Sequence, residues 1–207
     1  MREREDLIRE IVSTEWMMFD KVHNCGSQAC CQDDWGTFEV MRGSQMEAWP
    51  LDLLENYCKD LRTAESEGRN LLCEKYAYMM EQANPEEYEA IRDRLPVPSI
   101  EKVWLTDWIC SVLTLCQKET AAQYPALASR YRVVNQNEDR SRAVSFETYL
   151  RGELMTYSVE TLRTYAAYIE KLTKEGKNLS LMILENAVRH YGYTDLEVAE
   201  EDTRGRV

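Results

Sequence analysis

Apolar residues recur at intervals of three or four along most of this chain, which is the spacing of one face of an α-helix. The clearest stripe lies between residues 105 and 116, where Leu105, Ile109 and Leu113 fall at every fourth position. No segment of useful length alternates apolar and polar residues, so strands are not expected. The pattern predicts an all-α protein of about eight to nine helices packed as one helical bundle.

Helix-capping residues and helix breakers divide this pattern into elements. Asp33 and Asp34 offer an N-cap and a first-turn acid for a helix that reaches about Trp49. The Pro-rich segment 95–98 is the expected boundary between two halves of the chain. Further helices are expected to begin after a polar cap and to stop at a glycine, with starts at Asn70, Ser99, Ser145, Ser158 and Asn178 and stops at Gly68 and Gly176.

An internal repeat relates the two halves. Residues 8–19 align with residues 100–111, and residues 37–71 align without a gap with residues 145–179. Such a repeat predicts two similar helical halves that face each other about a pseudo-two-fold axis. The expected organisation is a first repeat at 1–98 with a cysteine-rich loop at 23–34, a second repeat at 99–193, and a flexible acidic tail at 194–207.

Composition and charge narrow the classes of function. The net charge of −12 argues against a nucleic-acid groove, because phosphate binding requires a basic face. No apolar run approaches the roughly 20 residues of a membrane span. The charged N-terminus does not have the pattern of a secretory signal, and the cysteine count of seven is odd. We therefore expect a cytoplasmic protein with reduced thiols and no membrane association.

Carboxylates on apolar helix faces are candidates for a site near the centre of the bundle. Burial of an isolated carboxylate is very unfavourable, so these groups are expected to have partners. The favoured interpretation is an internal network of salt bridges, with Arg42 and Arg151 one turn after two of the acids. The alternative is a dinuclear metal site, although neither His23 nor His190 lies three residues after a glutamate. The repeat pairs four such acids as Glu15 with Asp107 and Glu39 with Glu147.

The loop at 23–34 has no copy in the second half and concentrates reactive side chains. Cys31 precedes a helix N-terminus, which lowers a thiol pKa, so it is a candidate nucleophile with His23 as its base. A zinc site formed by His23, Cys25, Cys30 and Cys31 is the second interpretation, although no CxxC spacing is present. The third is a packed connection between two helices without chemistry. The sequence leaves all three open.

A second candidate ligand-binding site lies at the start of the helix after Gly68. Arg69 and Asn70 stand at a helix N-terminus, which is a ready site for anions, and Glu74 follows one turn later. Lys177 and Asn178 repeat this arrangement in the other half. The alternative is an ordinary helix corner with solvated bases.

Three segments of the chain carry a distinctive pattern: EWMMFDKVHNCGSQACCQDDWGTFEVMRGSQ, EGRNLLCEKYAYMM and SFETYLRGELMTYS. They resemble a bacterial, all-helical family of domains of unknown function. The resemblance covers nearly the whole chain, and its specific part is the string QDDW-TF-MR-SQ. Cys25 and Cys30 depart from the family pattern, which weakens the zinc interpretation. The family implies no activity, but its members occur beside or fused to nucleotidyltransferase-like domains. The pattern itself carries Cys31, Gln32, Asp33, Asp34, Thr37, Arg42, Ser44 and Gln45.

Together these features predict a protein that binds a small polar or anionic ligand between its halves, with no cofactor or metal. The ligand-binding residues would be Asp33, Asp34, Arg42, Gln45, Arg69 and Asn70. If the protein is an enzyme, its catalytic residues would be Cys31 as nucleophile or redox thiol, His23 as base, and Glu15 or Glu74 as the group that moves a proton. The alternative is a non-catalytic helical interaction module that partners a nucleotidyltransferase-like protein.

Overall fold

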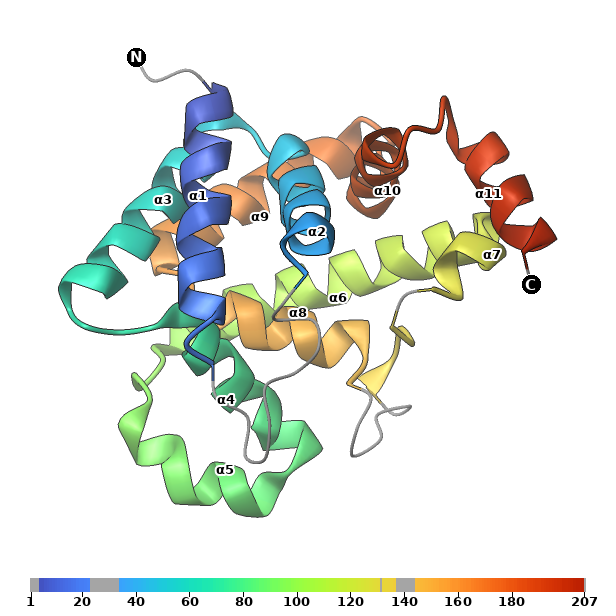
Figure 1. Ribbon diagram of the computed structural model, residues 1–207. Coiled ribbons are helices and arrows are strands. Elements are labelled where there is room, and N and C mark those ends of the chain that lie inside the picture. Colours follow the sequence, from blue (N-terminus) through green and yellow to red (C-terminus); the bar gives the residue numbers. More distant parts are fainter. Residues whose placement is uncertain (1–3, 23–33, 131, 137–143, 207) are drawn as a thin grey trace.

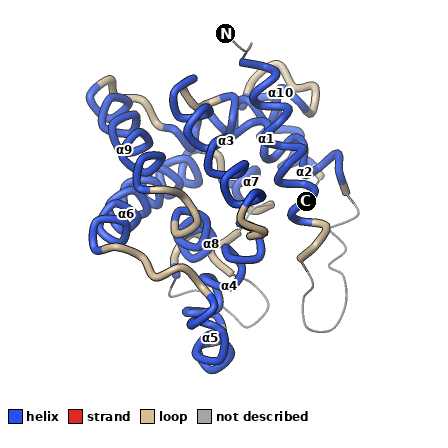
Figure 2. The backbone as a smooth tube through the Cα atoms, turned by 90° about the vertical axis from the view of Figure 1, so that its left-hand side faces the viewer, coloured by secondary structure: helices blue, strands red, loops and turns tan. Residues whose placement is uncertain are grey.

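The computed structural model describes residues 4–22, 34–130, 132–136 and 144–206 of the chain. Every regular element in these residues is a helix, so the predicted all-α class is confirmed (Figure 2). The first half contains α1 (Arg4–Phe19), α2 (Trp35–Glu47), α3 (Leu51–Ser66), α4 (Leu71–Ala83), α5 (Pro85–Ile91) and the 3-10 turn η2 (Arg92–Arg94). The second contains α6 (Ile100–Gln123), α7 (Pro125–Ala128), α8 (Phe146–Leu154), α9 (Val159–Lys174), α10 (Leu179–His190) and α11 (Leu196–Gly205).

The described part of the chain thus has eleven α-helices, more than the eight or nine expected, and the unexpected elements are α7 and α11. The predicted caps of α4, α6, α8, α9 and α10 are confirmed, and the cap of α2 is Asp34, which was expected in the first turn. Each of these side chains accepts a hydrogen bond from the backbone N–H three residues later: Asp34, Asn70, Ser99, Ser145, Ser158 and Asn178. Gly68 and Gly176 follow α3 and α9 with φ of 69° and 67°, the left-handed conformation in which glycine is favoured.

The helices pack in a crossed arrangement around the long helix α6, which runs across the middle of the molecule (Figure 1). α1 packs against α2 and α3, and α6 packs against α8 and α9. α4 reaches across to α8 of the second half, and α10 reaches across to α2 of the first. Helices that are distant in the sequence therefore enclose a common interior.

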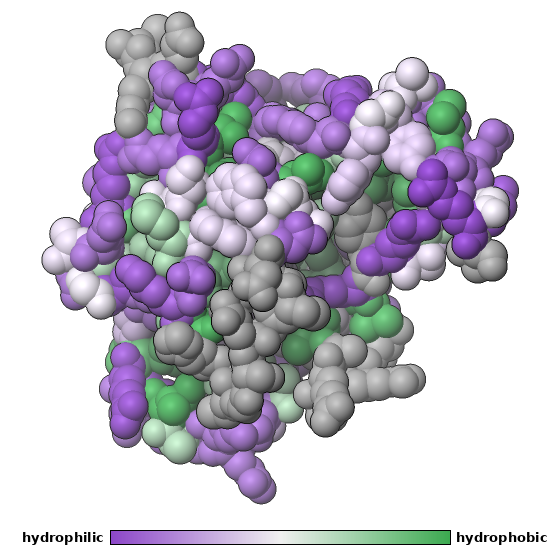
Figure 3. All heavy atoms as spheres, in the orientation of Figure 1, coloured by the Kyte–Doolittle hydropathy of each residue, from purple (hydrophilic) through white to green (hydrophobic). Residues whose placement is uncertain are grey.

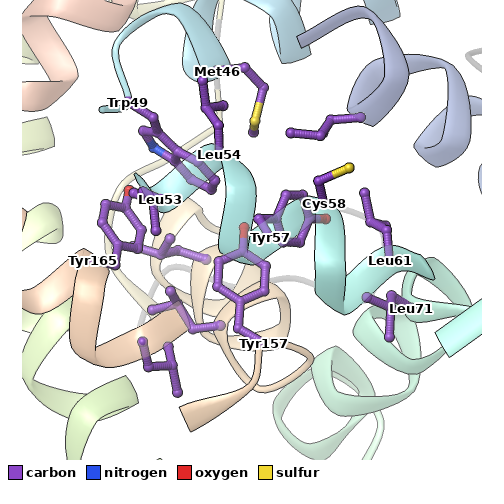
Figure 4. Packing of buried hydrophobic residues seen from close by; sticks show 14 of the residues in the cluster. Met46, Trp49, Leu53, Leu54, Tyr57, Cys58, Leu61, Leu71, Tyr157 and Tyr165 are labelled. Atoms are coloured by element: carbon purple, nitrogen blue, oxygen red, sulfur yellow. The ribbon is translucent and has the colours of Figure 1, made fainter. Parts of the chain in front are cut away.

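Aromatic rings from both halves form the centre of the main core (Figure 4). Tyr57 of α3 and Tyr157 after α8 lie with ring centroids 4.7 Å apart, and Trp49 lies 5.0 Å from Tyr165 of α9. All four side chains are almost fully buried. Aromatic side chains bury large apolar areas, so these contacts are a major source of cohesion between the segments 49–57 and 157–165.

α8 approaches α4 closely at Gly152. A Cβ atom at this position would lie 2.8 Å from the carbonyl oxygen of Lys75 and 2.6 Å from Cγ of Met79. Only glycine allows this separation without a shift of either helix. The close contact brings Glu153, the next residue of α8, beside Lys75.

The C-terminal segment is a packed helix, so the prediction of a flexible tail at 194–207 is wrong. Leu196 and Ala199 of α11 are buried in a second core cluster that also contains Leu127 of α7. Glu200 is buried, and its two carboxylate oxygens accept the backbone N–H groups of Ala126 and Leu127, each at 2.8 Å. The prediction gave too much weight to the acidic composition of this segment. It overlooked an apolar stripe at helical spacing and a buried glutamate, Glu200, that caps α7.

The surface is mainly hydrophilic on the face shown in Figure 3, with smaller hydrophobic patches between the hydrophilic side chains. Among the described helices, none combines the length and the apolar character that crossing a bilayer requires.

Candidate functional site

A cavity of about 760 Å³ lies between helices of the first and second halves. Most of its wall is apolar, and among the described residues that form this part are Phe19, Phe38, Met41, Leu72, Tyr76, Leu113, Phe146, Leu150, Ile183 and Leu184. Charged side chains converge on one part of the wall: Glu15, Arg42, Lys75 and Glu153. Mostly apolar cavities of about 300–1,000 Å³ with a few convergent polar groups are typical of small-molecule sites.

Glu15 and Arg42 form the first ion pair of this group. Arg42 donates from Nε to Glu15 Oε2 at 2.7 Å and from Nη2 to Glu15 Oε1 at 2.5 Å. Glu15 is 1% exposed and Arg42 is 7% exposed. The expectation that Glu15 is buried with a partner is confirmed, but the partner of Arg42 is not the predicted Glu39, which lies exposed on α2.

Glu153 of α8 is the second buried carboxylate. It accepts a hydrogen bond from Lys75 Nζ at 2.6 Å and another from Arg42 Nη1 at 3.1 Å. Sequence reasoning missed this residue. Glu153 follows Leu150 by three positions and precedes Leu154, so it stands on the apolar face of its helix, and the criterion that selected Glu15 would have selected it too.

Three polar side chains complete the hydrogen bonding of the two acids. Tyr57 donates its hydroxyl to Glu15 Oε1 at 2.6 Å, and Tyr157 donates its hydroxyl to Glu153 Oε1 at 2.7 Å. Gln45 accepts from Arg42 Nη1 at 2.7 Å and donates to Glu153 Oε1 at 3.3 Å. We call this set the charge cluster: Glu15, Arg42, Gln45, Tyr57, Lys75, Glu153 and Tyr157.

The protonation states of the cluster follow from burial and from the neighbouring charges. Burial alone would raise the pKa of Glu153, but the positive charges of Arg42 and Lys75 outweigh it and hold this pKa well below its usual value. Burial alone would lower the pKa of Lys75, but the charge of Glu153 raises it above the usual value. Lys75 and Glu153 are therefore an ion pair around neutral pH. The pKa values of the two tyrosines are raised, first by burial and then by the carboxylates.

The mouth of the cavity carries further charges. Arg130 and Arg132 follow α7, are exposed and line the cavity. The guanidinium carbon of Arg132 lies 4.8 Å from the ring centroid of Tyr149, and Lys75 Nζ lies 3.5 Å from the same centroid. Asp34 also lines the cavity, and its carboxylate accepts the N–H of Thr37 at 2.9 Å. This hydrogen bond lowers the pKa of Asp34.

Comparison with known protein families gives a match that covers most of this architecture. The model of the family described as "Protein of unknown function (DUF4125)" matches residues 5–201. The chain belongs to this family. The matched range includes all described members of the charge cluster and of the cavity wall. No curated protein and no solved structure matches the chain.

Several predicted site residues lie elsewhere. Glu74 pairs with Arg69 through two hydrogen bonds of 2.8 Å, and Asn70 caps α4 and donates to the carbonyl oxygen of Met18. None of the three lines the cavity. The proposal that Glu74 faces the same cavity as Glu15 is therefore wrong, because the side chain of Glu74 is held at a helix corner.

The four carboxylates related by the repeat do not converge. Asp107 is exposed and pairs with Arg151 at 2.5 Å, and Glu147 accepts the backbone N–H of Gln136 at 2.8 Å. Within the described residues, no three His, Cys, Asp or Glu side chains are grouped closely enough to hold a metal ion. The interpretation as a dinuclear site built from these acids is therefore wrong.

The predicted catalytic residues His23 and Cys31, the predicted ligand-binding residue Asp33, and the possible zinc ligands Cys25 and Cys30 lie outside the described residues. The interpretations of that loop stay predictions. Of the remaining predicted residues, Glu15, Asp34, Arg42 and Gln45 all line the cavity.

Proposed function

We propose that this protein binds a small amphipathic anion in the cavity between its two helical halves. The observation that carries the proposal is an apolar cavity whose polar groups are concentrated at the charge cluster and the mouth. An apolar body would contact the aromatic and aliphatic wall, and an anionic group would lie among the bases. Among the residues that the structure describes, four basic side chains line the cavity (Arg42, Lys75, Arg130 and Arg132) against three acidic ones (Glu15, Asp34 and Glu153). This excess is notable in a chain with a net charge of −12.

The contacts of Glu15 and Arg42 favour a structural role at the cavity wall over catalysis or direct anchoring of the anion. Glu15 accepts from Arg42 and Tyr57, and the Arg42 donors point to Glu15, Gln45 and Glu153. A general base needs a free lone pair directed at the ligand, and an anion anchor needs a free donor. These residues have the contacts of a framework that joins α1, α2, α3, α4 and α8 at the cavity wall.

The proposal also includes the pseudo-two-fold relationship of the halves. It is supported by α3 and α9, which have 16 residues each and end before a glycine in the left-handed conformation. It is supported by Asn70 and Asn178, which cap α4 and α10 and donate to backbone carbonyls at Met18 and Cys116. A cavity at the junction of duplicated halves has walls from both, as the lining residues of this one do.

Two fluorescent probes with the same aromatic frame test the proposal. One is 8-anilinonaphthalene-1-sulfonate, which carries one negative charge, and the other is the uncharged N-phenyl-1-naphthylamine. We expect saturable binding of the sulfonate and weaker binding of the neutral probe. Ile183→Trp fills part of the cavity and should weaken binding of the sulfonate probe by about tenfold or more. Val97→Trp is the matched control, because residue 97 is 94% exposed and does not line the cavity.

Failure of the sulfonate to saturate would contradict the proposal, and so would equal binding to the wild type and to Ile183→Trp. Circular dichroism of both variants would establish that each retains its helical content.

A second candidate function has one observation in its favour. Val97, Ile100 and Trp104 are 94%, 91% and 63% exposed at the start of α6. Exposed apolar groups of this kind suit a protein-docking surface, the role expected of an interaction module for a nucleotidyltransferase-like protein. Co-purification of such a protein with the wild type, and its loss with Trp104→Glu while the probes still bind, would favour this candidate.

A further inference from the structure

Three basic side chains on the cavity wall keep donors that the described residues do not use. Lysine has three N–H donors and arginine has five. Lys75 gives one hydrogen bond, to Glu153, and Arg132 gives one, to the carbonyl oxygen of Val144 at 3.1 Å. The side chain of Arg130 makes neither a hydrogen bond nor an ion pair with any residue that the structure describes. Its charge acts at longer range on Asp202 and Tyr193.

The ring of Tyr149 holds two of these cations near each other. Lys75 Nζ and the guanidinium carbon of Arg132 lie 3.5 Å and 4.8 Å from its centroid. Each cation is attracted to the ring, but the two positive charges repel each other. Of these two cations, Lys75 pairs with Glu153, whereas Arg132 pairs with no acid that the structure describes. An anion beside Tyr149 would therefore relieve an uncompensated positive charge.

We propose that the ligand carries a phosphate monoester group, and that Arg132 and Arg130 bind this group at the cavity mouth with Lys75 behind the Tyr149 ring. This inference rests on the function proposed above and names the ligand class. Among the described residues, Asp34 is the exposed acid that lines the cavity, and it already accepts a hydrogen bond from Thr37.

The number of cations favours phosphate over a singly charged acid. Among the described residues, Arg130 and Arg132 have no acid as an ion-pair partner and Lys75 has one, Glu153, so an anion with more than one charge gains most. A phosphate monoester carries about −1.5 to −2 charges at pH 7, whereas a carboxylate or a sulfonate carries −1. The planar arginine fork also matches the spacing of phosphate oxygens.

The surroundings of Arg132 provide room for both ends of such a ligand. On the cavity side, Phe19 stacks on Phe38 at 5.5 Å and on Tyr76 at 6.4 Å, with planes within 17° of parallel. These rings belong to the apolar wall of the cavity, where a planar apolar body can pack against them. On the other side, Arg132 also lines a second hollow of about 400 Å³ that contains Lys118. The phosphate would thus lie where the two hollows share Arg132.

Titration calorimetry with three naphthalene compounds tests this subsite on the full chain. The compounds are 1-naphthyl phosphate, naphthalene-1-sulfonate and 1-naphthol, which share a ring system and differ in charge. We expect the phosphate to bind about tenfold or more tighter than the sulfonate, and the sulfonate tighter than the naphthol. Arg132→Gln should remove most of the preference for phosphate but retain binding of naphthol, and Arg132→Lys should be intermediate. Arg163→Gln is the control, because Arg163 is exposed, pairs with Glu101 and lies outside the cavity wall.

Equal affinity for phosphate and sulfonate, or an unchanged preference in Arg132→Gln, would overturn the phosphate subsite. If the sulfonate still bound in a manner sensitive to Ile183→Trp, the proposed function would stand without the subsite. If none of the compounds bound, both proposals would fail. Both Arg132 variants replace an exposed side chain, so their melting temperatures should stay close to that of the wild type.

Discussion

Arg42 and Glu15 are joined by two hydrogen bonds in the protein interior, although 27 positions separate them in the sequence. The pair fastens α2 to α1, and Arg42 extends the connection to Glu153 of α8. Buried ion pairs of this kind gain little net stability over apolar residues, but loss of one partner leaves an uncompensated charge in the interior. The pair therefore determines how these three helices fit together more than it adds to the free energy of folding.

Arg42→Met should destabilise the protein by about 3–5 kcal/mol, because Glu15 would then lack its buried counter-charge and Glu153 would keep only Lys75. Combination with Glu15→Gln should recover part of this loss. Urea unfolding at neutral pH measures both changes. Arg151→Met is the matched control, since the exposed Arg151–Asp107 pair should contribute about 0–1 kcal/mol. Equal losses for Arg42→Met and Arg151→Met would show that the buried pair has no special role.

The ion pair of Glu153 should make stability depend on acidity. Its pKa is lowered in the folded state, so its contribution is present above the unfolded value near 4.5 and is lost as pH falls below it. The free energy of unfolding should therefore fall between about pH 5 and pH 3, and Glu153→Gln should flatten this slope. Denaturant titrations at several pH values give the slope. Glu160→Gln, which changes an exposed acid, should leave it as steep as in the wild type.

Gly152 and Gly43 provide a paired test of the contact between α8 and α4. Gly152→Ala should destabilise the protein by about 1–3 kcal/mol, because the added methyl group meets the backbone of Lys75. Gly43→Ala should instead stabilise it by up to about 1 kcal/mol, since no atom of another element lies within 4 Å and alanine favours helix. Thermal unfolding of both variants measures the difference. A Gly152→Ala protein as stable as Gly43→Ala would contradict the close approach.

Glu200 should determine whether α11 stays docked. Glu200→Ala leaves the N–H groups of Ala126 and Leu127 without their buried acceptors, at a cost of about 1–3 kcal/mol. Hydrogen exchange at these two amides should accelerate together with exchange along α11. Glu201→Ala removes a neighbouring exposed acid and should change neither. Unchanged protection in Glu200→Ala would mean that apolar contacts alone hold the helix.

Local features of the sequence were sufficient for most helix boundaries. Caps such as Ser99 and Ser158 accept hydrogen bonds from backbone groups three residues away. Gly68 and Gly176 end their helices because they adopt the left-handed conformation. These effects depend on neighbours in the chain and little on the fold. The C-terminal tail shows where such reasoning failed. There the acidic composition outweighed the spacing of Leu196 and Ala199, whose burial depends on α7 and on residues of α10.

The amino-acid sequence by itself determined that the protein is helical, where most helices begin and end, and that Glu15 faces the interior. Only the tertiary structure decided which partners Glu15 meets, that Glu153 and Lys75 share its surroundings, and that Glu74 and Asp107 do not. The physical reason is one of range. Helix periodicity and capping act over about four residues, whereas the partners of a buried charge are set by how α1, α2, α4 and α8 cross.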